Sequence, residues 1–265
     1  TDGVLTRTVR DTALGLDVLT IGWPGDGYRL PPPATTYLQA CDRAPGPLRV
    51  GVLREPIIAD CAVAPAALRA VERAEAVLRG LGHDVAEAPR PFPADRWAAF
   101  AALWSVLALS IPLPPQAEDL LTPLTRWLRE RGRAVSGVEY AVAVAATQQL
   151  ARATAVAWDS YDVILTPTLA QPPAPLGSLR DDADPAADFD AQCAFTPWTS
   201  TYNLTGRPAI SLPLHREVTG AGEAAVELPY GVMLGARLGE DETLLSLAAQ
   251  LEAADPWVGT IPTVG

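Results

Sequence analysis

An apolar run, a helix-forming segment and a second apolar run follow one another in the first third of the chain. The first run is GPLRVGVLRE, residues 46–55, and the second is HDVAEA, which begins at His83. Between them, Pro65 suits the first turn of a helix, apolar residues recur at helical spacing, and Gly80 or Gly82 can end the helix. Two strands joined by such a helix pair in parallel through a crossover. This order therefore predicts an α/β fold.

The rest of the chain supplies further strands and helices. Val163 to Leu165 form a strong buried-strand pattern, and PAISLPL and YGVMLGA are typical of paired strands joined by a long turn. Helical spacing, with capping residues at Thr8 and Asp241, predicts helices over 8–19, 94–111, 117–131, 136–159 and 241–254. A chain of 265 residues can bury one large core. We therefore expect a single α/β unit.

Charge and composition disfavour several classes of function. The net charge of −11 would repel a phosphate backbone, and no cluster of Arg with interleaved aromatic residues opposes it, so we expect no nucleic-acid partner. No apolar run reaches 18 residues; the nearest, Trp97 to Leu113, suits a buried helix, and we expect no membrane span. The three cysteines are far apart and form no CxxC, which disfavours a zinc site or a disulfide framework and favours a reducing compartment.

The stretch FTPWTSTYNLTG contains the only asparagine of the chain, Asn203, and is a candidate binding element. Thr196 and Pro197 suit a helix start and Gly206 a helix end, which predicts a helix over 197–205. At roughly 100° per residue, one stripe of this helix holds Thr196, Thr199, Ser200 and Asn203. Such a stripe could bind a small polar substrate in a cleft, or it could be an ordinary solvated face. A third alternative is that Asn-Leu-Thr is a glycosylation sequon.

Polar residues also follow the buried strand. Because ligands in open α/β sheets bind outside the carboxyl ends of strands, Thr166, Thr168 and Gln171 stand where a site can form. The acidic segment 180–192 is most simply a solvated mobile loop, and its carboxylate pairs are more typical of solvent exposure than of catalysis.

Motifs for nucleophilic catalysis are missing from the sequence. Such catalysis needs a hydroxyl or thiol with a base within hydrogen-bond reach. The only histidines, His83 and His215, are typical of surface or turn positions, and all 20 basic residues are Arg. The chain has no GxSxG, SxxK, HExxH or P-loop. We therefore assign no catalytic residue and no metal ligand to it.

Three parts of the chain resemble the amidase signature family. GVLTRTVRDTALGLDVL, residues 3–19, is similar to the helix that follows the family's catalytic segment. YDVILTPTLAQPPAPLG, residues 161–177, resembles its Asp-x-Leu-Leu-x-Pro-Thr strand and loop. YNLTGRPAISLPL, residues 202–214, with YGVMLGARLGEDETLLSLAAQLE, residues 230–252, is similar to its carboxyl-terminal block. These segments occur in the family's order over nearly the whole chain. By this resemblance the chain is identified as a member of the amidase signature family.

The resemblance implies an α/β/α sandwich around a mixed β-sheet flanked by helices, present here as an incomplete fragment. Residues 1–265 would be the carboxyl-terminal part of a single domain. It also implies carboxamide hydrolysis by a Ser, cis-Ser, Lys triad, in which Lys acts as base through the bridging Ser and the second Ser attacks the carbonyl. The triad would lie upstream, because this chain has neither a Lys nor a Gly-Ser-Ser-Gly segment. We expect the fragment alone to be inactive and to expose apolar surface.

The predicted substrate-binding residues are Thr168, Gln171, Thr196, Ser200 and Asn203. Met233 stands where the family strand usually has Gln, and Thr196 stands where the glutamine-dependent transamidating members carry Asp. These departures favour a small neutral or apolar carboxamide as substrate. We expect no cofactor and a cytoplasmic location, and a homodimer is a compatible assembly. The alternative is a non-catalytic binding subunit or pseudo-enzyme of the same fold.

Overall fold

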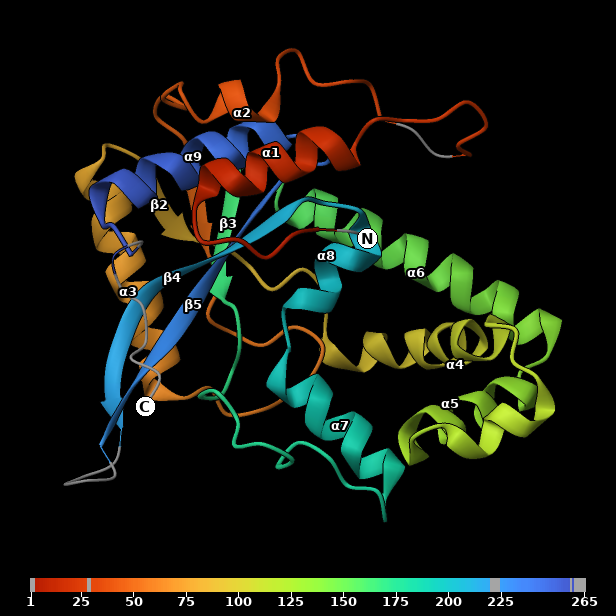
Figure 1. The fold of residues 1–265 in the computed structure, drawn as a ribbon. Helices are drawn as coiled ribbons and strands as arrows, with labels where there is room; N and C mark the ends of the chain where they lie inside the picture. The colour runs from red at the N-terminus through yellow and green to blue at the C-terminus, as the bar shows by residue number, and fades with distance from the viewer. Residues whose placement is uncertain (1–2, 28–29, 220–224, 258, 260–265) are drawn as a thin grey trace.

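The centre of the molecule is a mixed β-sheet with helices on both faces (Figure 1). The computed structural model describes residues 3–27, 30–219, 225–257 and 259. Within these residues the strand order is β2-β1-β3-β5-β4. The strands are β1 (Arg49–Val52), β2 (Asp84–Glu87), β3 (Val163–Pro167), β4 (Ala209–Thr219) and β5 (Val226–Ala236). β1 runs parallel to β2 and β3, whereas β5 pairs antiparallel with β3 and β4.

One face of the sheet is covered by α1, α2, α3 and α9 (Figure 1). These helices are α1 (Val9–Leu19), α2 (Tyr37–Ala40), α3 (Pro65–Gly80) and α9 (Asp241–Ala254). Successive strand residues point to opposite faces, and Val50, Val163 and Leu165 point to this one, where they join the apolar sides of α3 and α9 in one buried cluster. The cluster forms the larger part of the core.

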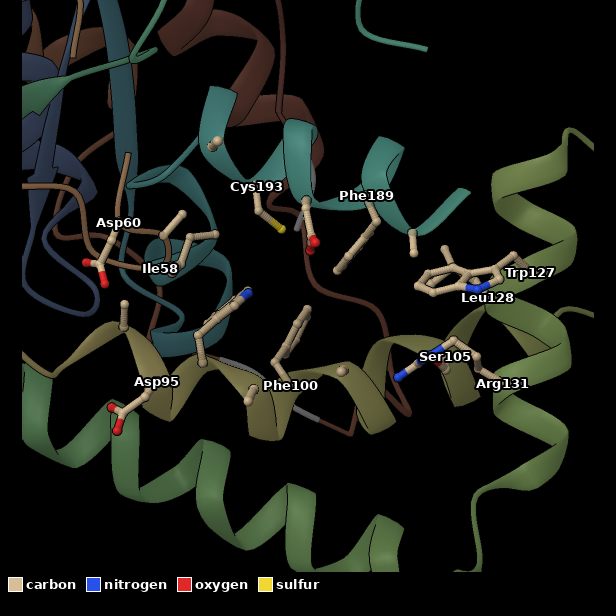
Figure 2. Close-up of a pocket in the computed structure, with 18 residues that line it drawn as sticks. Ile58, Asp60, Asp95, Phe100, Ser105, Trp127, Leu128, Arg131, Phe189 and Cys193 are labelled. Atoms are coloured by element: carbon tan, nitrogen blue, oxygen red, sulfur yellow. The ribbon is translucent and has the colours of Figure 1, made fainter. Parts of the chain in front are cut away.

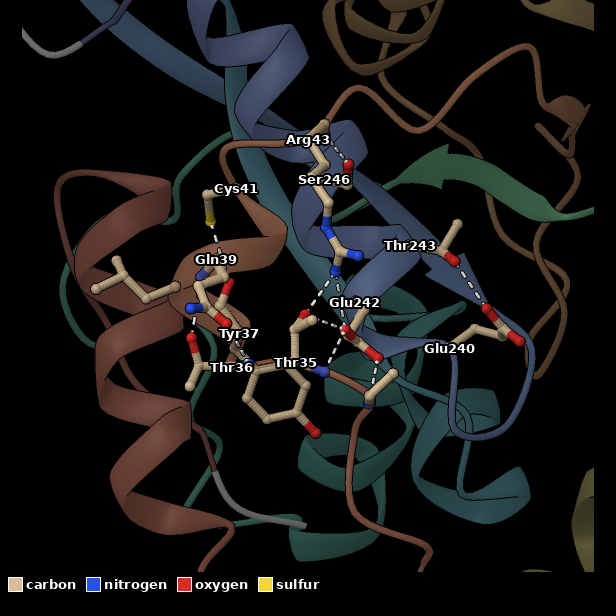
Figure 3. A network of polar contacts seen from close by, with 12 residues as sticks. Thr35, Thr36, Tyr37, Gln39, Cys41, Arg43, Glu240, Glu242, Thr243 and Ser246 are labelled. Atoms are coloured by element: carbon tan, nitrogen blue, oxygen red, sulfur yellow. Dashed lines mark hydrogen bonds and ion pairs between the residues drawn. The ribbon is translucent and has the colours of Figure 1, made fainter.

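The segment before β1 is fastened to α9 by a polar network around Glu242 (Figure 3). The Glu242 carboxylate accepts hydrogen bonds from the Thr35 hydroxyl at 2.6 Å, the Arg43 guanidinium at 3.0 Å and the Ala34 backbone N–H at 3.0 Å. Ser246, one turn further along α9, donates to the Arg43 carbonyl. Charge-assisted bonds of this kind fix a loop more firmly than neutral ones.

The opposite face of the sheet carries the remaining helices, several of which extend well beyond it (Figure 1). They are η1 (Ala94–Ala99), α4 (Phe100–Ser110), η2 (Pro115–Leu120), α5 (Pro123–Ala134), α6 (Gly137–Ala157), α7 (Pro185–Phe195) and α8 (Thr199–Thr205). Ile164 and Met233 point to this face and pack with the buried rings of Trp158, Trp198 and Tyr202. A second, more aromatic core results.

Most of the expected elements are confirmed. The first strand, helix and second strand form the predicted parallel unit, with Val50 opposite Val85. Thr8 caps α1 by accepting from the Asp11 N–H, and Gly206 ends α8 with a φ of 69°. The fold is the α/β class with a mixed, helix-flanked sheet that the sequence predicts.

Several helix boundaries differ from the predictions. Thr196 does not begin a helix over 197–205: it ends α7, its hydroxyl donates to the Gln192 carbonyl, and α8 begins only at Thr199. The helix predicted over 117–131 is divided into η2 and α5, because Thr122 precedes a proline and has extended backbone. α9 begins at Asp241, but Glu240 is its cap residue and no side chain caps it.

Two segments differ in burial from the predictions. The run Trp97 to Leu113 is not a buried helix: among α4 residues only Ser105 is buried, while Trp104 and Leu107 are 43% and 45% exposed. The acidic segment 180–192 is not wholly a solvated loop, because α7 begins within it at Pro185. His83 lies in a turn as expected, but it is buried between the Leu48 N–H and the Gln250 side chain.

Candidate functional site

The carboxyl ends of β1 and β3 mark the point where the chain changes faces of the sheet. The connection from β1 to β2 runs through α3 on one face, and that from β2 to β3 runs through α4, α5 and α6 on the other. In α/β sheets, ligand sites form in the crevice at such a switch point. This end of the sheet is therefore where a site is expected on topology alone.

Hydrogen bonds hold together the loops at this end. The Ala64 N–H donates to the Ala170 carbonyl at 2.7 Å, and Gln171 Nε2 donates to the Ala62 carbonyl at 2.9 Å. The Ile58 N–H donates to the Pro197 carbonyl at 3.1 Å. The loops after β1 and β3 and the junction between α7 and α8 thus form one fixed frame.

An aromatic cavity of about 750 Å³ lies beside this frame, and we use that name for it below (Figure 2). It is bounded by the loop after β1 and by residues of η1, α4, α5 and α7. Its principal side chains are Ile58, Trp97, Phe100, Trp127, Phe189 and Cys193. Its size is within the usual range for small-molecule pockets. Burial raises the pKa of the Cys193 thiol, and the nearby Asp190 carboxylate raises it further, so this cysteine is a neutral apolar lining group at neutral pH.

A second hollow of about 1260 Å³, which we call the hydroxyl groove, lies between the segment 3–12, α8 and β4. Asn203, Ser211 and Met233 line it. At its edge the hydroxyls of Ser211 and Thr168 are 2.7 Å apart, and a Cβ added at Gly231 would come within 2.9 Å of both. The glycine therefore leaves room for this hydroxyl pair.

In helix α8 the buried residues and the more exposed residues lie on different sides, as the stripe pattern predicts. Trp198 at its start and Tyr202 are buried, whereas Asn203 is exposed and Ser200 is half-buried. The Trp198 indole N–H donates to the Glu55 carbonyl at 2.9 Å. Burial also raises the pKa of the Tyr202 phenol, which keeps it protonated at neutral pH. The aromatic side thus anchors α8, and the Asn203 side faces the hydroxyl groove.

The five predicted binding residues are not gathered in one pocket. Asn203 lines the hydroxyl groove, and Thr168 touches its edge through Ser211. The Gln171 side chain donates a hydrogen bond to the Ala62 carbonyl, and the Thr196 hydroxyl donates one to the Gln192 carbonyl. The substrate-binding role of these residues, together with Ser200, stays a prediction.

The aromatic cavity is a candidate site that the sequence did not indicate. Trp97 and Phe100 stack with ring centroids 4.4 Å apart, and the rings of Trp127 and Phe189 are 6.1 Å apart. These residues come from three distant segments, and each resembles an ordinary core aromatic in its own helix. The sequence signal for it is the aromatic content of residues 97–104, which lies within the run predicted to be a buried helix.

Two general properties of the described residues bear on the kind of site. No group of three or more His, Cys, Asp or Glu side chains among them is arranged to hold a metal ion. In the same part of the chain no helix is long and apolar enough to cross a membrane. The two hollows instead combine apolar or aromatic walls with a few hydroxyl, amide and charged groups, which is the usual character of small-molecule sites.

Comparison with known proteins decides the family. The model of the Amidase family matches residues 1–245. The chain belongs to the amidase family. It is 31% identical over 279 residues to the 6-aminohexanoate-cyclic-dimer hydrolase of Paenarthrobacter ureafaciens, covering 98% of this chain and 55% of that protein. It is also 31% identical over 265 residues to the putative amidase AmiB2 of Mycobacterium tuberculosis, covering 99% of this chain and 54% of that protein.

The fold of this amidase-family chain is also that of solved relatives. The structure of a 6-aminohexanoate cyclic dimer hydrolase, also solved with its substrate, superposes with a TM-score of 0.81 at 28% identity, covering 97% of this chain and 55% of that one. A bacterial aryl acylamidase of the amidase signature family superposes with a TM-score of 0.67 at 20% identity, covering 96% of this chain and 53% of that one. The chain spans about half the length of the relatives it matches.

Proposed function

We propose that the protein containing these 265 residues hydrolyses a small neutral or apolar carboxamide by serine acyl-enzyme chemistry. The observation that carries this proposal is the match of 98% of the chain to a protein named 6-aminohexanoate-cyclic-dimer hydrolase, together with the Amidase family match. In that chemistry a serine oxygen bonds to the amide carbon, the amine leaves with a proton, and water then releases the acid.

In this proposal the chain supplies the scaffold and one side of the substrate site, and the triad comes from residues outside it. The absence of Lys in the sequence means that a Lys base cannot come from these residues. Asn203 and the Thr168–Ser211 pair would bind the polar part of the amide, with Ser200, Gln171 and Thr196 supporting them. The 265 residues are then the carboxyl-terminal part of a single cytoplasmic domain.

The test is hydrolysis of a panel of simple amides by the protein expressed from its full reading frame. We expect activity that is lost when the chain is limited to residues 1–265. Replacing Asn203 with Ala should raise KM about tenfold, the effect of losing one or two hydrogen bonds. Ser178→Ala, in an exposed loop, is the control. Absence of hydrolysis across the panel, or an upstream sequence without Lys and a Gly-Ser-Ser-Gly segment, would refute the proposal.

A non-catalytic binding subunit or pseudo-enzyme is the second candidate. Its support is that the sequence has neither a Lys nor a Gly-Ser-Ser-Gly segment. A reading frame whose own start codon immediately precedes residue 1 would favour it. Amide hydrolysis by purified protein of these 265 residues would contradict both this candidate and the assignment of the triad to residues outside the chain.

A further inference from the structure

The aromatic cavity has a neutral inner wall and a charged rim. The charged residues that line it are all exposed to solvent, and we call them the rim: Asp60, Asp95, Arg131 and Asp190. The inner wall is made of apolar and aromatic side chains together with Cys193, whose thiol is neutral because burial raises its pKa. A ligand inside the cavity therefore meets neutral groups, while the charges of the rim stay in contact with water.

Aromatic rings from four different elements surround this interior. Trp97 of η1 stacks on Phe100 of α4 with ring centroids 4.4 Å apart, and the Trp127 ring of α5 is 6.1 Å from that of Phe189 of α7. In Figure 2, Phe100 and Phe189 reach toward each other from opposite walls. Phe100, Trp127 and Phe189 are only half-buried, so part of each side chain stays open. Such rings bind another ring in an offset or edge-on arrangement.

The side of α4 that faces the cavity carries small side chains. Ala101 and Ser105 both line the cavity, and residues four apart lie on the same side of an α-helix. The Trp97 ring lines the cavity four residues before Ala101. Because the alanine side chain ends at Cβ, it leaves room for a ligand between the Trp97 ring and Ser105.

Ser105 brings a single hydroxyl to this wall, and that hydroxyl is unpaired. Ser105 is 1% exposed, and its side chain has no hydrogen bond to any residue that the structure describes. Thr154, which is buried in α6, behaves differently, because its hydroxyl donates to the Leu150 carbonyl one turn back at 2.9 Å. Buried hydroxyls in proteins normally have a partner. The cavity is the place from which a partner for Ser105 can come.

We propose that the aromatic cavity binds a neutral aromatic molecule with one hydrogen-bonding group on its ring, and that this group bonds to the Ser105 hydroxyl. The open rings select an aromatic body, the neutral wall disfavours an ionised group, and Ser105 selects the polar substituent. The binding itself does not depend on amide hydrolysis. It deepens the proposed function in one respect, because the bound ring would be part of the amide that the whole protein cleaves, and this role alone rests on the proposed function.

The test measures binding to the protein expressed from its full reading frame, by titration calorimetry at neutral pH. The probes are 4-ethylphenol, ethylbenzene, 4-ethylcyclohexanol and 4-ethylbenzoate. We expect 4-ethylphenol to bind at least about threefold more tightly than ethylbenzene, the effect of one hydrogen bond. It should also bind more tightly than 4-ethylcyclohexanol, which lacks a ring face, and than 4-ethylbenzoate, whose charge would lose its hydration inside. Equal or tighter binding of any of these three comparison probes would overturn the proposal.

Variants assign the two features of the ligand to two parts of the cavity. Ser105→Ala should weaken 4-ethylphenol binding at least about threefold and leave ethylbenzene binding unchanged. Ser110→Ala is the matched control, because Ser110 lies on the same helix, is exposed and does not line the cavity. Phe189→Leu should weaken both aromatic probes at least about twofold and affect 4-ethylcyclohexanol less. The proposal fails if Ser105→Ala weakens both aromatic probes equally, or if Ser110→Ala has the same effect as Ser105→Ala.

The same measurements separate this proposal from the proposed function. If 4-ethylphenol binds in a manner that depends on Ser105 but the protein hydrolyses no amide, the cavity proposal stands and only the proposed function is refuted. If the protein hydrolyses amides but shows no preference for 4-ethylphenol over ethylbenzene, only the cavity proposal is refuted. Competitive inhibition of hydrolysis by 4-ethylphenol, weakened in Ser105→Ala, would support the role of the cavity in holding part of the amide.

Discussion

Gly235 in β5 is glycine because the Tyr202 ring occupies the space that a side chain would need. A Cβ added there would overlap Tyr202 Cε1, and the ring cannot move freely because Tyr202 is 3% exposed. This contact seats α8, and with it Asn203, on the sheet. A close approach of this kind explains the glycine without any need for an unusual φ.

We therefore predict that Gly235→Ala lowers the free energy of unfolding by about 1–3 kcal/mol, the usual cost of forcing extra volume into a packed core. Gly80→Ala is the matched control, because Gly80 ends α3 with nothing within 4 Å of an added Cβ. Urea unfolding of both variants gives the comparison. Equal stability of the two would mean that the Tyr202 contact does not constrain α8.

Glu118 and Arg129 form an ion pair whose stability depends on pH. The Glu118 carboxylate accepts from Arg129 Nη2 at 2.6 Å, and Arg129 is 4% exposed and also donates to the carbonyls of Ala108 and Ile111. Hydrogen bonding from Arg129, with its positive charge, holds the pKa of Glu118 below its usual value of 4.5. A lowered folded-state pKa stabilises the fold above pH 4.5, and this stabilisation disappears as the pH falls through the lower value.

Glu118→Gln should therefore be less stable than the unchanged protein at neutral pH, and the difference should shrink as the pH falls below about 4.5. Chemical unfolding at a series of pH values measures it. Glu130→Gln, in which an α5 side chain that is 77% exposed is changed, serves as the control. A stability difference for Glu118→Gln that does not change with pH would show that the ion pair is not its source.

At the level of elements, the helix pair α4 and α5 frames the aromatic cavity by approaching closely at Gly132. A Cβ at Gly132 would overlap the Ser105 carbonyl, which belongs to the backbone and cannot rotate away. Gly132→Ala should therefore push α5 outward, cost about 1–3 kcal/mol of stability, and move Trp127 and Arg131 relative to Phe100. Gly137→Ala, at the start of α6 with open space around it, should change neither property.

The measurement is thermal unfolding of both variants. Equal stability of Gly132→Ala and Gly137→Ala would mean that the close approach at Gly132 does not set the spacing of α4 and α5.

The sequence predicted elements where local patterns decide the structure, and failed where distant contacts decide it. The unit from β1 to β2 and the paired strands β4 and β5 follow from apolar runs and Gly and Pro signals. Thr196 looked like a helix start because a proline follows it, yet α7 extends to Phe195, and Thr196 caps its end instead. The aromatic cavity was missed because its walls meet only in three dimensions.

For the molecule as a whole, exposed apolar side chains lie on several elements of the described residues, among them α1, α4, α6 and the end of β4. On α1, Leu14 and Val18 are 53% and 65% exposed. β4 ends the strand order within the described residues, and Val218 near its end is 61% exposed. A long edge strand offers unpaired N–H and C=O groups to another chain. The family resemblance predicts exposed apolar surface, but only the fold shows on which elements it lies.

We predict that the purified 265-residue chain self-associates through the β4 edge and binds a hydrophobic dye. Val218→Lys should weaken the association, because a charged side chain on an edge strand opposes pairing with a second edge. Val138→Lys, which adds the same charge on α6 at a position 75% exposed, separates this effect from the change in net charge. Sedimentation velocity over a range of protein concentrations distinguishes the outcomes. If the chain remains monomeric at every concentration and melts cooperatively, the β4 edge does not drive self-association. The expectation that further structure must pack against β4 would then be wrong.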